Sequence, residues 1–271
     1  MSHLRPVLSD TSPVYAETST GICFLTLDSP PANALSMEMI ATLRTHLARA
    51  AGDDAVRVVV LGATGKVFSA GHDLKEIAAH RADADKGRAF FTELMTECGA
   101  LMQEIVRHPK PVIAAVAGVA SAAGCQLVAS CDLAIATTEA TFATPGVNIG
   151  LFCSTPMVAL SRNVSRKQAM EMLLTGEMIE ATTAREFGLV NRVVPPEYLN
   201  QIVGKYAQAI ASKSALTLKI GKEAFYAQAE MELSGAYEYA GRVMVENMLA
   251  RDAEEGIGAF IDKRKPQWDD V

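Results

Sequence analysis

Residues 111–131 carry no formal charge, and this stretch restricts the possible folds more than any other part of the chain. Its length would allow it to cross a bilayer, for which about 20 apolar residues are enough. Its composition argues against a membrane span, because Ala, Gly and Ser dominate it and Gln126 lies within it, whereas Leu, Ile and Phe supply most of the favourable transfer into lipid. The stretch is therefore predicted to form a buried strand, a tight turn and a helix.

The same order of elements recurs along the chain. Residues 56–63 and 111–118 are apolar runs, each long enough for one buried strand, and a third strand is predicted over 131–137. Helices are predicted between these strands, over about 87–108 and from about Ala122. Strands that alternate with helices are typical of parallel sheets, so the predicted fold class is α/β.

The two ends of the chain have different patterns. Residues 14–30 show partial alternation around a Thr-Gly pair, which predicts a hairpin of two short strands. After Pro195 the apolar residues follow helical spacing in several consecutive segments. We therefore predict an α/β core over 1–195 and a helical region over 196–271 that serves oligomerisation, because its apolar faces exceed what one small core can cover.

Composition and charge argue against several classes of protein. The net charge of −6 disfavours a nucleic-acid-binding protein, because such proteins concentrate Lys and Arg on one face. The five cysteines show neither C-x-x-C spacing nor a cluster with His, so reduced buried thiols are expected and no metal site is indicated. The first residues include Arg5, Pro6 and Asp10 but no apolar signal segment, which predicts a cytoplasmic location and no membrane partner.

The sequence matches two familiar motifs only in part. Gly62, Gly65 and Lys66 follow a predicted strand, yet a phosphate-binding loop needs four residues between its glycines and Ser or Thr after the Lys, where this chain has two residues and Val67. Ser121 has two residues on each side before a glycine, which does not match the turn of a hydrolase nucleophile. Neither nucleotide hydrolysis nor a hydrolase triad is indicated.

Two short stretches combine small residues with the start of a predicted helix. They are FSAGHDLKE at 68–76 and ASAAGCQ at 120–126, and each follows a buried strand. A helix start leaves backbone N–H groups unpaired, and Gly or Ala lets a ligand approach them closely. Two such starts side by side would present two donors to one oxygen, as an oxyanion hole does. Ordinary strand-to-helix turns are the alternative interpretation.

Several motifs in order resemble the enoyl-CoA hydratase/isomerase (crotonase) superfamily. They lie at 68–76, 111–137, 140–151 and 255–266, and the resemblance spans nearly the whole chain. It implies a spiral of ββα units whose C-terminal helices build a homotrimer, often paired into a homohexamer. It also implies an acyl-CoA thioester as the substrate, with its carbonyl oxygen between two backbone N–H groups and no cofactor other than the coenzyme A that the substrate carries.

The resemblance assigns positions in this chain to those roles. The two N–H donors would be the amides of His72 and Ala123, and the family commonly has Gly where Ala123 stands. Lys75 would reach the phosphates of coenzyme A, and Lys263 of a neighbouring subunit would add a second positive charge. The backbone that would hold the adenine comprises Ala70, His72, Asp73 and Leu74. As single residues, both lysines would otherwise be interpreted as solvated surface charges.

The two glutamates that hydratases of this family use are replaced here by Gln126 and Gly146. An amide has no proton to exchange near neutral pH and glycine has no side chain, so neither position can supply general acid–base catalysis. Nearby candidates for a replacement are Asn148, Cys153 and Ser154, none of which is an acid. Cys153 could titrate if its thiol were perturbed, although an inert small residue is the simpler interpretation.

The sequence therefore predicts an acyl-CoA enzyme of this family, a lyase or an isomerase of fatty acid metabolism, with weak or altered hydratase activity. A second hypothesis is a non-catalytic acyl-CoA-binding or regulatory protein that has kept the pocket. A third hypothesis is a scaffold that does not bind coenzyme A and uses the trimer surface.

Overall fold

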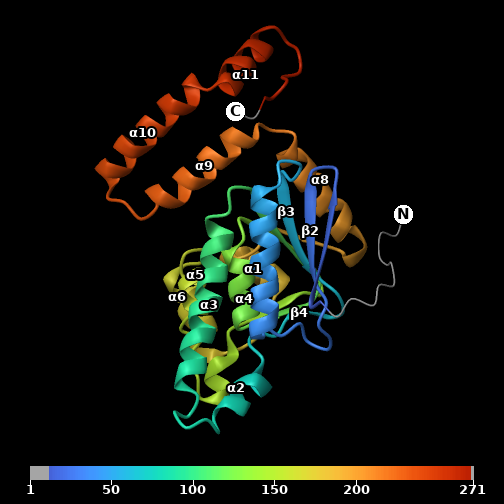
Figure 1. Ribbon diagram of the computed structural model, residues 1–271, viewed down its shortest axis with the longest axis vertical. Coiled ribbons are helices and arrows are strands. Elements are labelled where there is room, and N and C mark those ends of the chain that lie inside the picture. The colour runs from blue at the N-terminus through green and yellow to red at the C-terminus, as the bar shows by residue number, and fades with distance from the viewer. Residues whose placement is uncertain (1–11, 270–271) are drawn as a thin grey trace.

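The computed structural model describes residues 12–269, so the predictions made on the first residues lie outside it. A six-stranded sheet in the order β1-β2-β3-β5-β7-β10 forms the centre of the molecule (Figure 1). Its strands are β1 (Val14–Ser19), β2 (Ile22–Leu27), β3 (Val58–Ala63), β5 (Val112–Val116), β7 (Leu133–Thr137) and β10 (Arg192–Val194). The β1–β2 hairpin is antiparallel and the other pairs are parallel, which confirms the predicted α/β class.

A second sheet of four short strands lies beside the first, in the order β4-β6-β8-β9. Its strands are β4 (Val67–Ser69), β6 (Val119–Ser121), β8 (Thr141–Ala143) and β9 (Ile179–Glu180). The apolar run at 111–118 forms one strand, β5, as predicted, and the chain then bends at Gly118 and enters the short strand β6. The bend requires Gly118, since a Cβ atom there would lie 1.9 Å from the carbonyl oxygen of Lys66.

β3, β5 and β7 are each followed by a short strand and then by a helix or 3₁₀ turn, which gives repeated ββα units. The helices and 3₁₀ turns before residue 199 are α1 (Met37–Gly52), α2 (Leu74–His80), α3 (Arg88–Val106), α4 (Ala123–Ser130), η1 (Pro145–Ile149), α5 (Pro156–Leu160), α6 (Arg166–Thr175), α7 (Ala181–Phe187) and η2 (Pro196–Tyr198). Residues 111–131 divide among β5, β6 and α4, so the predicted strand and helix are present and the segment predicted as a turn contains the short strand β6. Within residues 12–269 no helix is long and apolar enough to cross a membrane.

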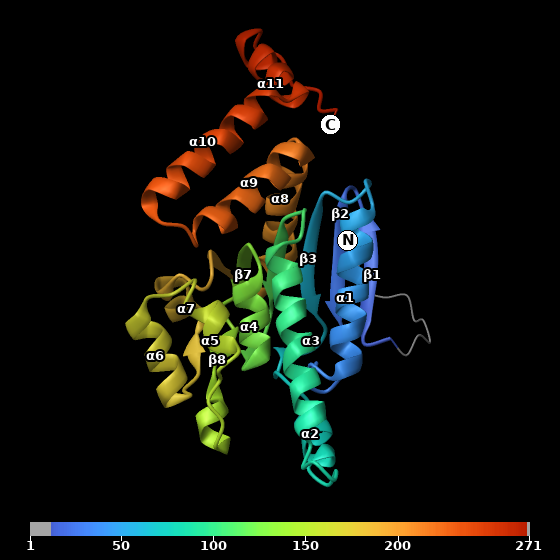
Figure 2. The same ribbon diagram turned by 60° about the vertical axis from the view of Figure 1, so that its left-hand side comes forward.

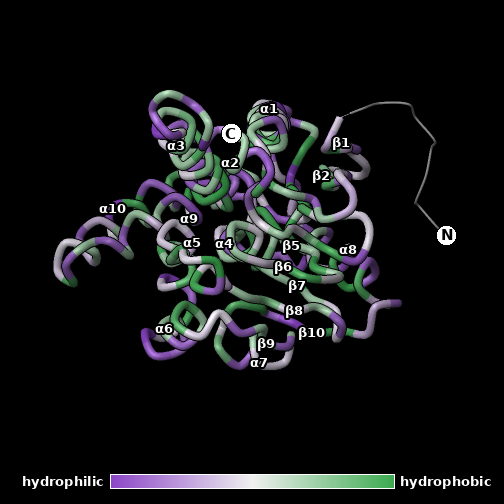
Figure 3. Tube along the Cα trace, turned by 90° about the horizontal axis from the view of Figure 1, so that it is seen from below, coloured by the Kyte–Doolittle hydropathy of each residue, from purple (hydrophilic) through white to green (hydrophobic). Residues whose placement is uncertain are grey.

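The core lies on both faces of the six-stranded sheet because β3 alternates between them. Val59 and Leu61 face a large cluster with α1, α3 and α4, while Val58 and Val60 face a smaller cluster with α8 (Leu199–Ala211). Figure 3 shows hydrophobic residues along the central strands. The helix α8 therefore packs on the sheet, although it belongs to the region over 196–271 that was predicted to serve oligomerisation. The division of the chain into these two regions stays a prediction.

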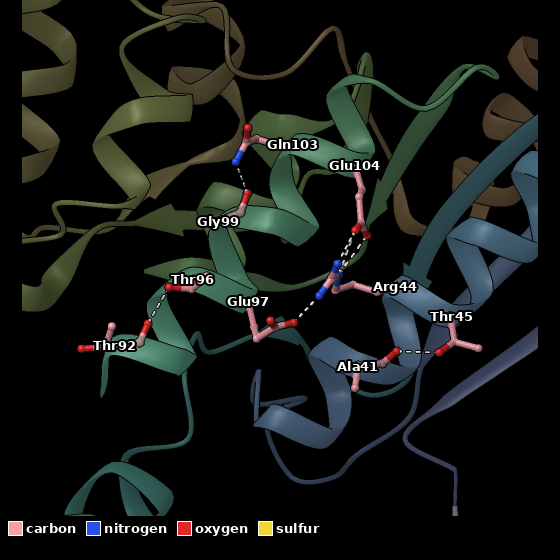
Figure 4. Close-up of polar contacts among 9 residues, drawn as sticks. All are labelled: Ala41, Arg44, Thr45, Thr92, Thr96, Glu97, Gly99, Gln103 and Glu104. Atoms are coloured by element: carbon pink, nitrogen blue, oxygen red, sulfur yellow. Dashed lines mark hydrogen bonds and ion pairs between the residues drawn. The ribbon is translucent and has the colours of Figure 1, made fainter. Parts of the chain in front are cut away.

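An ion-pair network holds α3 against α1 (Figure 4). The guanidinium of Arg44 donates to the carboxylate of Glu104 at 2.6, 2.9 and 3.1 Å and also to Glu97. A fork of donors that contacts two carboxylates restricts how the two helices slide. The position of α3 matters for the site described below, because Cys98 follows Glu97 directly.

The remaining helices extend away from both sheets (Figures 1 and 2). They are α9 (Ala215–Gln228), α10 (Leu233–Leu249) and α11 (Arg251–Ile261). No residue of α9 or α10 is buried, and large apolar side chains stand in solvent, with Phe260 of α11 85% exposed. Lys222 of α9 connects this extension to the core through Asp132, with 2.7 Å between Nζ and the carboxylate.

Candidate active site

The two glycine-containing turns identified in the sequence lie side by side. They follow β4 and β6, which are parallel neighbours in the short sheet. Gly71 has a φ of +89°, and a Cβ atom there would lie 2.9 Å from the Cβ of Ala122 and 3.1 Å from the amide nitrogen of Ala123. A Cβ atom on Gly124 would lie 2.2 Å from the carbonyl oxygen of Ser69. Both close approaches require glycine, so these residues bring the start of α4 against the end of β4.

The amides of His72 and Ala123 donate to no acceptor within residues 12–269. Ala123 is the first residue of α4, and the amide of a first helical residue has no partner in its own helix. The turn beside His72 is fixed, because the carbonyl of Gly71 accepts from the amide of Leu35 at 2.8 Å. The arrangement can therefore present two N–H donors, from two different turns, to one ligand oxygen.

Ala122 holds the second turn in an uncommon backbone conformation. Its φ and ψ are 49° and −118°, and its amide donates to the carbonyl of Ala143 in β8 at 2.9 Å. A residue other than glycine in such a region costs about 1–3 kcal/mol and persists only where the surroundings enforce it. Strain of this kind is concentrated at ligand-binding turns, which agrees with a functional role for this turn.

The imidazole ring of His72 is neutral and contacts Leu35. Its Nδ1 lies 3.3 Å from the carbonyl oxygen of Leu35, and burial lowers the pKa of the imidazole below its usual value. Donation from Nδ1 to Leu35 leaves Nε2 as an acceptor, and this buried nitrogen has no partner in the described part of the chain.

Gln126 lies one turn further along α4 and is 4% exposed. Its Oε1 is 4.0 Å from the Sγ of Cys98 on α3. Cys98 is fully buried, and burial raises the pKa of its thiol to about 12, so it stays protonated. The position that carries a carboxylate in hydratases by resemblance is therefore an uncharged amide beside an uncharged thiol.

Gly146 lies in η1, and there is no room for a side chain on it. A Cβ atom there would lie 2.8 Å from the carbonyl oxygen of Leu151 and 3.0 Å from the Sγ of Cys153. The loop is closed by a 2.9 Å hydrogen bond from the amide of Leu151 to the carbonyl of Gly146. Burial raises the pKa of the Cys153 thiol, partly opposed by a hydrogen bond from the Gly146 amide, so this thiol is protonated near neutral pH.

The residues proposed for coenzyme A lie at the surface near α2. The carboxylate of Asp73 accepts from the amides of Lys75 and Glu76 and so caps α2. The amide of Ala70 donates a hydrogen bond to the carbonyl of Ala32 at 3.0 Å. Leu74 and Lys75 are exposed, which leaves their side chains free to contact a ligand.

Lys263 is not close to these residues within one protomer. It follows α11, and Figures 1 and 2 both place α11 and α2 at opposite ends of the molecule. A contact between Lys263 and a ligand at Lys75 would therefore need a neighbouring subunit. Asn148 and Ser154, the other replacements considered for the missing carboxylates, are both exposed.

Sequence reasoning missed two groups at this site. Cys98 contacts Gln126 across the α3–α4 packing, and no motif around Cys98 indicates this contact. Thr144 follows Ala143 directly, and its hydroxyl is fully buried without a partner among residues 12–269. A buried polar atom without a partner is unfavourable. No sequence motif indicates that the hydroxyl of Thr144 is buried in this way.

The chain belongs to the enoyl-CoA hydratase/isomerase family, whose sequence model matches residues 17–271. It is 46% identical to rat enoyl-CoA hydratase domain-containing protein 3, mitochondrial, over 97% of this chain and 87% of the rat protein. The human protein of the same name is 46% identical over 96% of this chain and 84% of its own length. The resemblance stated from the motifs is confirmed.

Solved structures lead to the same fold. The crystal structure of human enoyl-CoA hydratase domain-containing protein 3 has a TM-score of 0.90 at 45% identity and covers 94% of this chain and 100% of that one. A crystal structure of an enoyl-CoA hydratase from Mycobacterium smegmatis has a TM-score of 0.90 at 48% identity, over 94% of this chain and 98% of that chain. The crotonase-like fold predicted from the resemblance is confirmed.

The predicted cytoplasmic location is wrong, because the rat, human and mouse relatives are all named as mitochondrial proteins. The prediction relied on the lack of an apolar signal segment. That feature argues only against secretion, since mitochondrial addresses are amphipathic and rich in Arg rather than apolar.

Proposed function

We propose that this protein binds acyl-CoA thioesters and holds the thioester carbonyl oxygen between the amides of His72 and Ala123. The observation that carries the proposal is that two amides that donate to no acceptor within residues 12–269 lie on two turns packed together at Gly71. Membership of the enoyl-CoA hydratase/isomerase family supports the same substrate class. Coenzyme A would enter as part of the substrate, with Lys75 and the exposed backbone near α2 in reach of it.

The chemistry that this site supports is stabilisation of negative charge on the thioester oxygen. Each such donor contributes about 10²–10³ in rate, and donors fixed by the backbone need no rearrangement during the reaction. The enzyme is therefore proposed to be a lyase or an isomerase acting through an enolate-like intermediate, within fatty acid metabolism. Ala123 supplies its donor through the backbone. Its methyl group leaves the thioester oxygen less room to approach this amide than glycine would.

Hydration of an enoyl thioester is proposed to be weak. It needs one group to take a proton from water and another to deliver a proton to the α-carbon, and each positioned group is worth about 10²–10⁴. Gln126 has no titratable proton, and the space beside Gly146 is filled by Leu151 and Cys153. Cys153 does not replace the missing base near neutral pH, because burial keeps its thiol protonated.

A non-catalytic acyl-CoA-binding protein is the second candidate. It is favoured by one observation, which is that neither position 126 nor position 146 offers a group able to exchange a proton. Its thioester site would be the same, so the two candidates differ only in turnover.

Incubation with crotonyl-CoA is expected to give hydration far slower than an ordinary enzyme rate of about 10 s⁻¹. A panel of acyl-CoA thioesters analysed by mass spectrometry would then identify any thioester that is converted. Binding with conversion of one panel member supports the enzyme, whereas tight binding with no conversion of any member supports the binding protein. Crotonyl-CoA hydration at an ordinary rate would contradict the role assigned to the missing carboxylates.

The protein is proposed to assemble into a homotrimer or homohexamer through α9, α10 and α11. The support is the exposed apolar surface of these helices, to which Leu233, Tyr237, Leu249 and Phe260 contribute. Apolar patches of this kind on soluble proteins mark interaction sites. Light scattering at micromolar concentration is expected to give three or six times the mass of one chain, and a monomer would contradict both the assembly and the role of Lys263 from a neighbour.

A further inference from the structure

The side chain of Gln126 is directed toward the proposed thioester site by helix geometry. Gln126 is three residues after Ala123 on α4, and residues three apart share one face of a helix. The Cα–Cβ bond in a helix tilts toward the N-terminus, so a long side chain lies over the preceding turn. That preceding turn carries the amide of Ala123. The end of Gln126 therefore lies close to the atoms that follow the carbonyl carbon of a bound acyl chain.

The amide of Gln126 has an accepting end and a donating end, and its accepting end contacts Cys98. A protonated thiol donates a weak hydrogen bond, and the Sγ of Cys98 lies 4.0 Å from Oε1 of Gln126. Burial keeps this thiol in the protonated form. With Oε1 at the thiol, Nε2 is the end of the amide that is left for a ligand.

The NH₂ group of Gln126 donates to no protein acceptor among residues 12–269. Unlike the hydroxyl of Thr144, its nitrogen is not one of the side-chain atoms sealed from solvent without a partner. An amide donor in a residue that is 4% exposed is unfavourable if it stays unpaired after a ligand expels water. A ligand oxygen at this point would remove that cost.

Apart from Nε2 of the His72 ring and the hydroxyl of Thr144, the polar groups placed around the bound thioester are donors. The amides of His72 and Ala123 face one oxygen, the NH₂ group of Gln126 faces a point further along the acyl chain, and Gly146 and Cys153 add no negative charge. A carboxylate at position 126 would repel a carbonyl oxygen, whereas an amide NH₂ attracts it. A ketone oxygen accepts hydrogen bonds and cannot donate them, so it suits this set of donors.

We propose that Gln126 is a specificity-determining hydrogen-bond donor for acyl-CoA thioesters that carry a carbonyl oxygen at C3, and that Cys98 is its positioning residue. The inference rests on the proposed acyl-CoA function and adds the substrate class, 3-oxoacyl-CoA. The thioester oxygen binds to the two backbone amides, and the C3 oxygen binds to Nε2 of Gln126. Two carbonyl groups separated by one carbon have their oxygens near each other. The two donors on α4, the amide of Ala123 and the side chain of Gln126, are likewise only one turn of the helix apart.

Binding of two ligands that differ only at C3 tests the inference. Isothermal titration calorimetry is carried out with butyryl-CoA and 3-oxobutyryl-CoA on the full-length protein. The 3-oxo ligand is expected to bind about tenfold more tightly, the value of one added hydrogen bond of about 1.4 kcal/mol. Gln126→Met keeps an unbranched side chain without the donor and is expected to bring the ratio of the two dissociation constants to about one.

Variants at Cys98 separate positioning from packing. Cys98→Ser keeps a donor to Oε1 and is expected to preserve the preference, whereas Cys98→Ala removes the sulfur atom and with it the donor and is expected to reduce the preference. Near-ultraviolet circular dichroism verifies that each variant is folded. Equal loss of the preference in both Cys98 variants would overturn the positioning role.

The remaining outcomes distinguish the two proposals. If neither ligand binds, the proposed acyl-CoA function fails. If the wild-type protein binds both ligands with equal affinity, the acyl-CoA function stands and the 3-oxo specificity is overturned. The specificity is also overturned if Gln126→Met retains the full preference, because the donor then lies elsewhere.

Discussion

Gly71→Ala is expected to lower turnover of the substrate found in the thioester panel by at least about 10²-fold, the value of one oxyanion donor. The added methyl group would meet the Cβ of Ala122 at 2.9 Å and the amide nitrogen of Ala123 at 3.1 Å. Relief of that contact must separate the two turns, and the amides of His72 and Ala123 would then no longer face one oxygen. The loss is geometric, because both N–H groups remain in the chain.

The infrared carbonyl stretch of bound butyryl-CoA, labelled with ¹³C at the thioester carbon, measures the same geometry without turnover. Hydrogen bonds to the oxygen lower this frequency, so the wild-type protein is expected to shift it downward and Gly71→Ala to lose most of the shift. The experiment is informative for a non-catalytic binder as well, because it requires only a bound thioester.

Gly65→Ala is the matched control for this variant. Gly65 also has a positive φ, of +77°, but a Cβ atom there would have no atom within 4 Å. Both variants therefore bear the backbone cost of alanine in this conformation, roughly 1 kcal/mol, and only Gly71→Ala adds the contact with Ala122. Equal carbonyl shifts for wild type and Gly71→Ala would show that these two turns do not hold the thioester oxygen.

The sequence predicted the elements around this site better than their contacts. The strand, turn and helix at 111–131 follow from composition and length, because a run without charge must be buried. The short strand β6 after the bend at Gly118 was missed, because an apolar run carries no periodic signal where β5 ends and β6 begins. Strands as short as β4 and β6 are likewise too short for a pattern to identify.

The predicted site depended on two kinds of information. The two turns were identified from small residues before helices, and their assignment to thioester binding came from the resemblance. The partner of Gln126 was not predicted, because Cys98 is 28 positions away and the contact depends on how α3 packs against α4. The lack of room at Gly146 was also hidden, since it depends on the path of the backbone at Leu151.

Lys222→Met is expected to destabilise the protein by about 3 kcal/mol, which corresponds to a fall in melting temperature of roughly 6–12 °C. The side chain of Lys222 is 7% exposed, and its ammonium group donates to Asp132 at 2.7 Å and to the carbonyls of Ile105 and Lys110 at 3.0 and 3.2 Å. Methionine has a similar length but no charge, so Asp132 would keep a largely buried carboxylate without its counter-ion. The remaining donors to that carboxylate are the amide of Val112 and the hydroxyl of Tyr226.

This pair connects positions 132 and 222, so its loss also releases α9 from the core that carries the site. Thermal unfolding is measured at one protein concentration, because subunit association alters the melting temperature. Lys205→Met on the exposed side of α8 is the control and is expected to change stability by less than about 0.5 kcal/mol. Adding Asp132→Asn to Lys222→Met removes the unpaired charge and is expected to recover part of the loss. A loss below about 1 kcal/mol for Lys222→Met, the value typical of an exposed pair, would contradict the role of this buried pair as the anchor of the C-terminal helices.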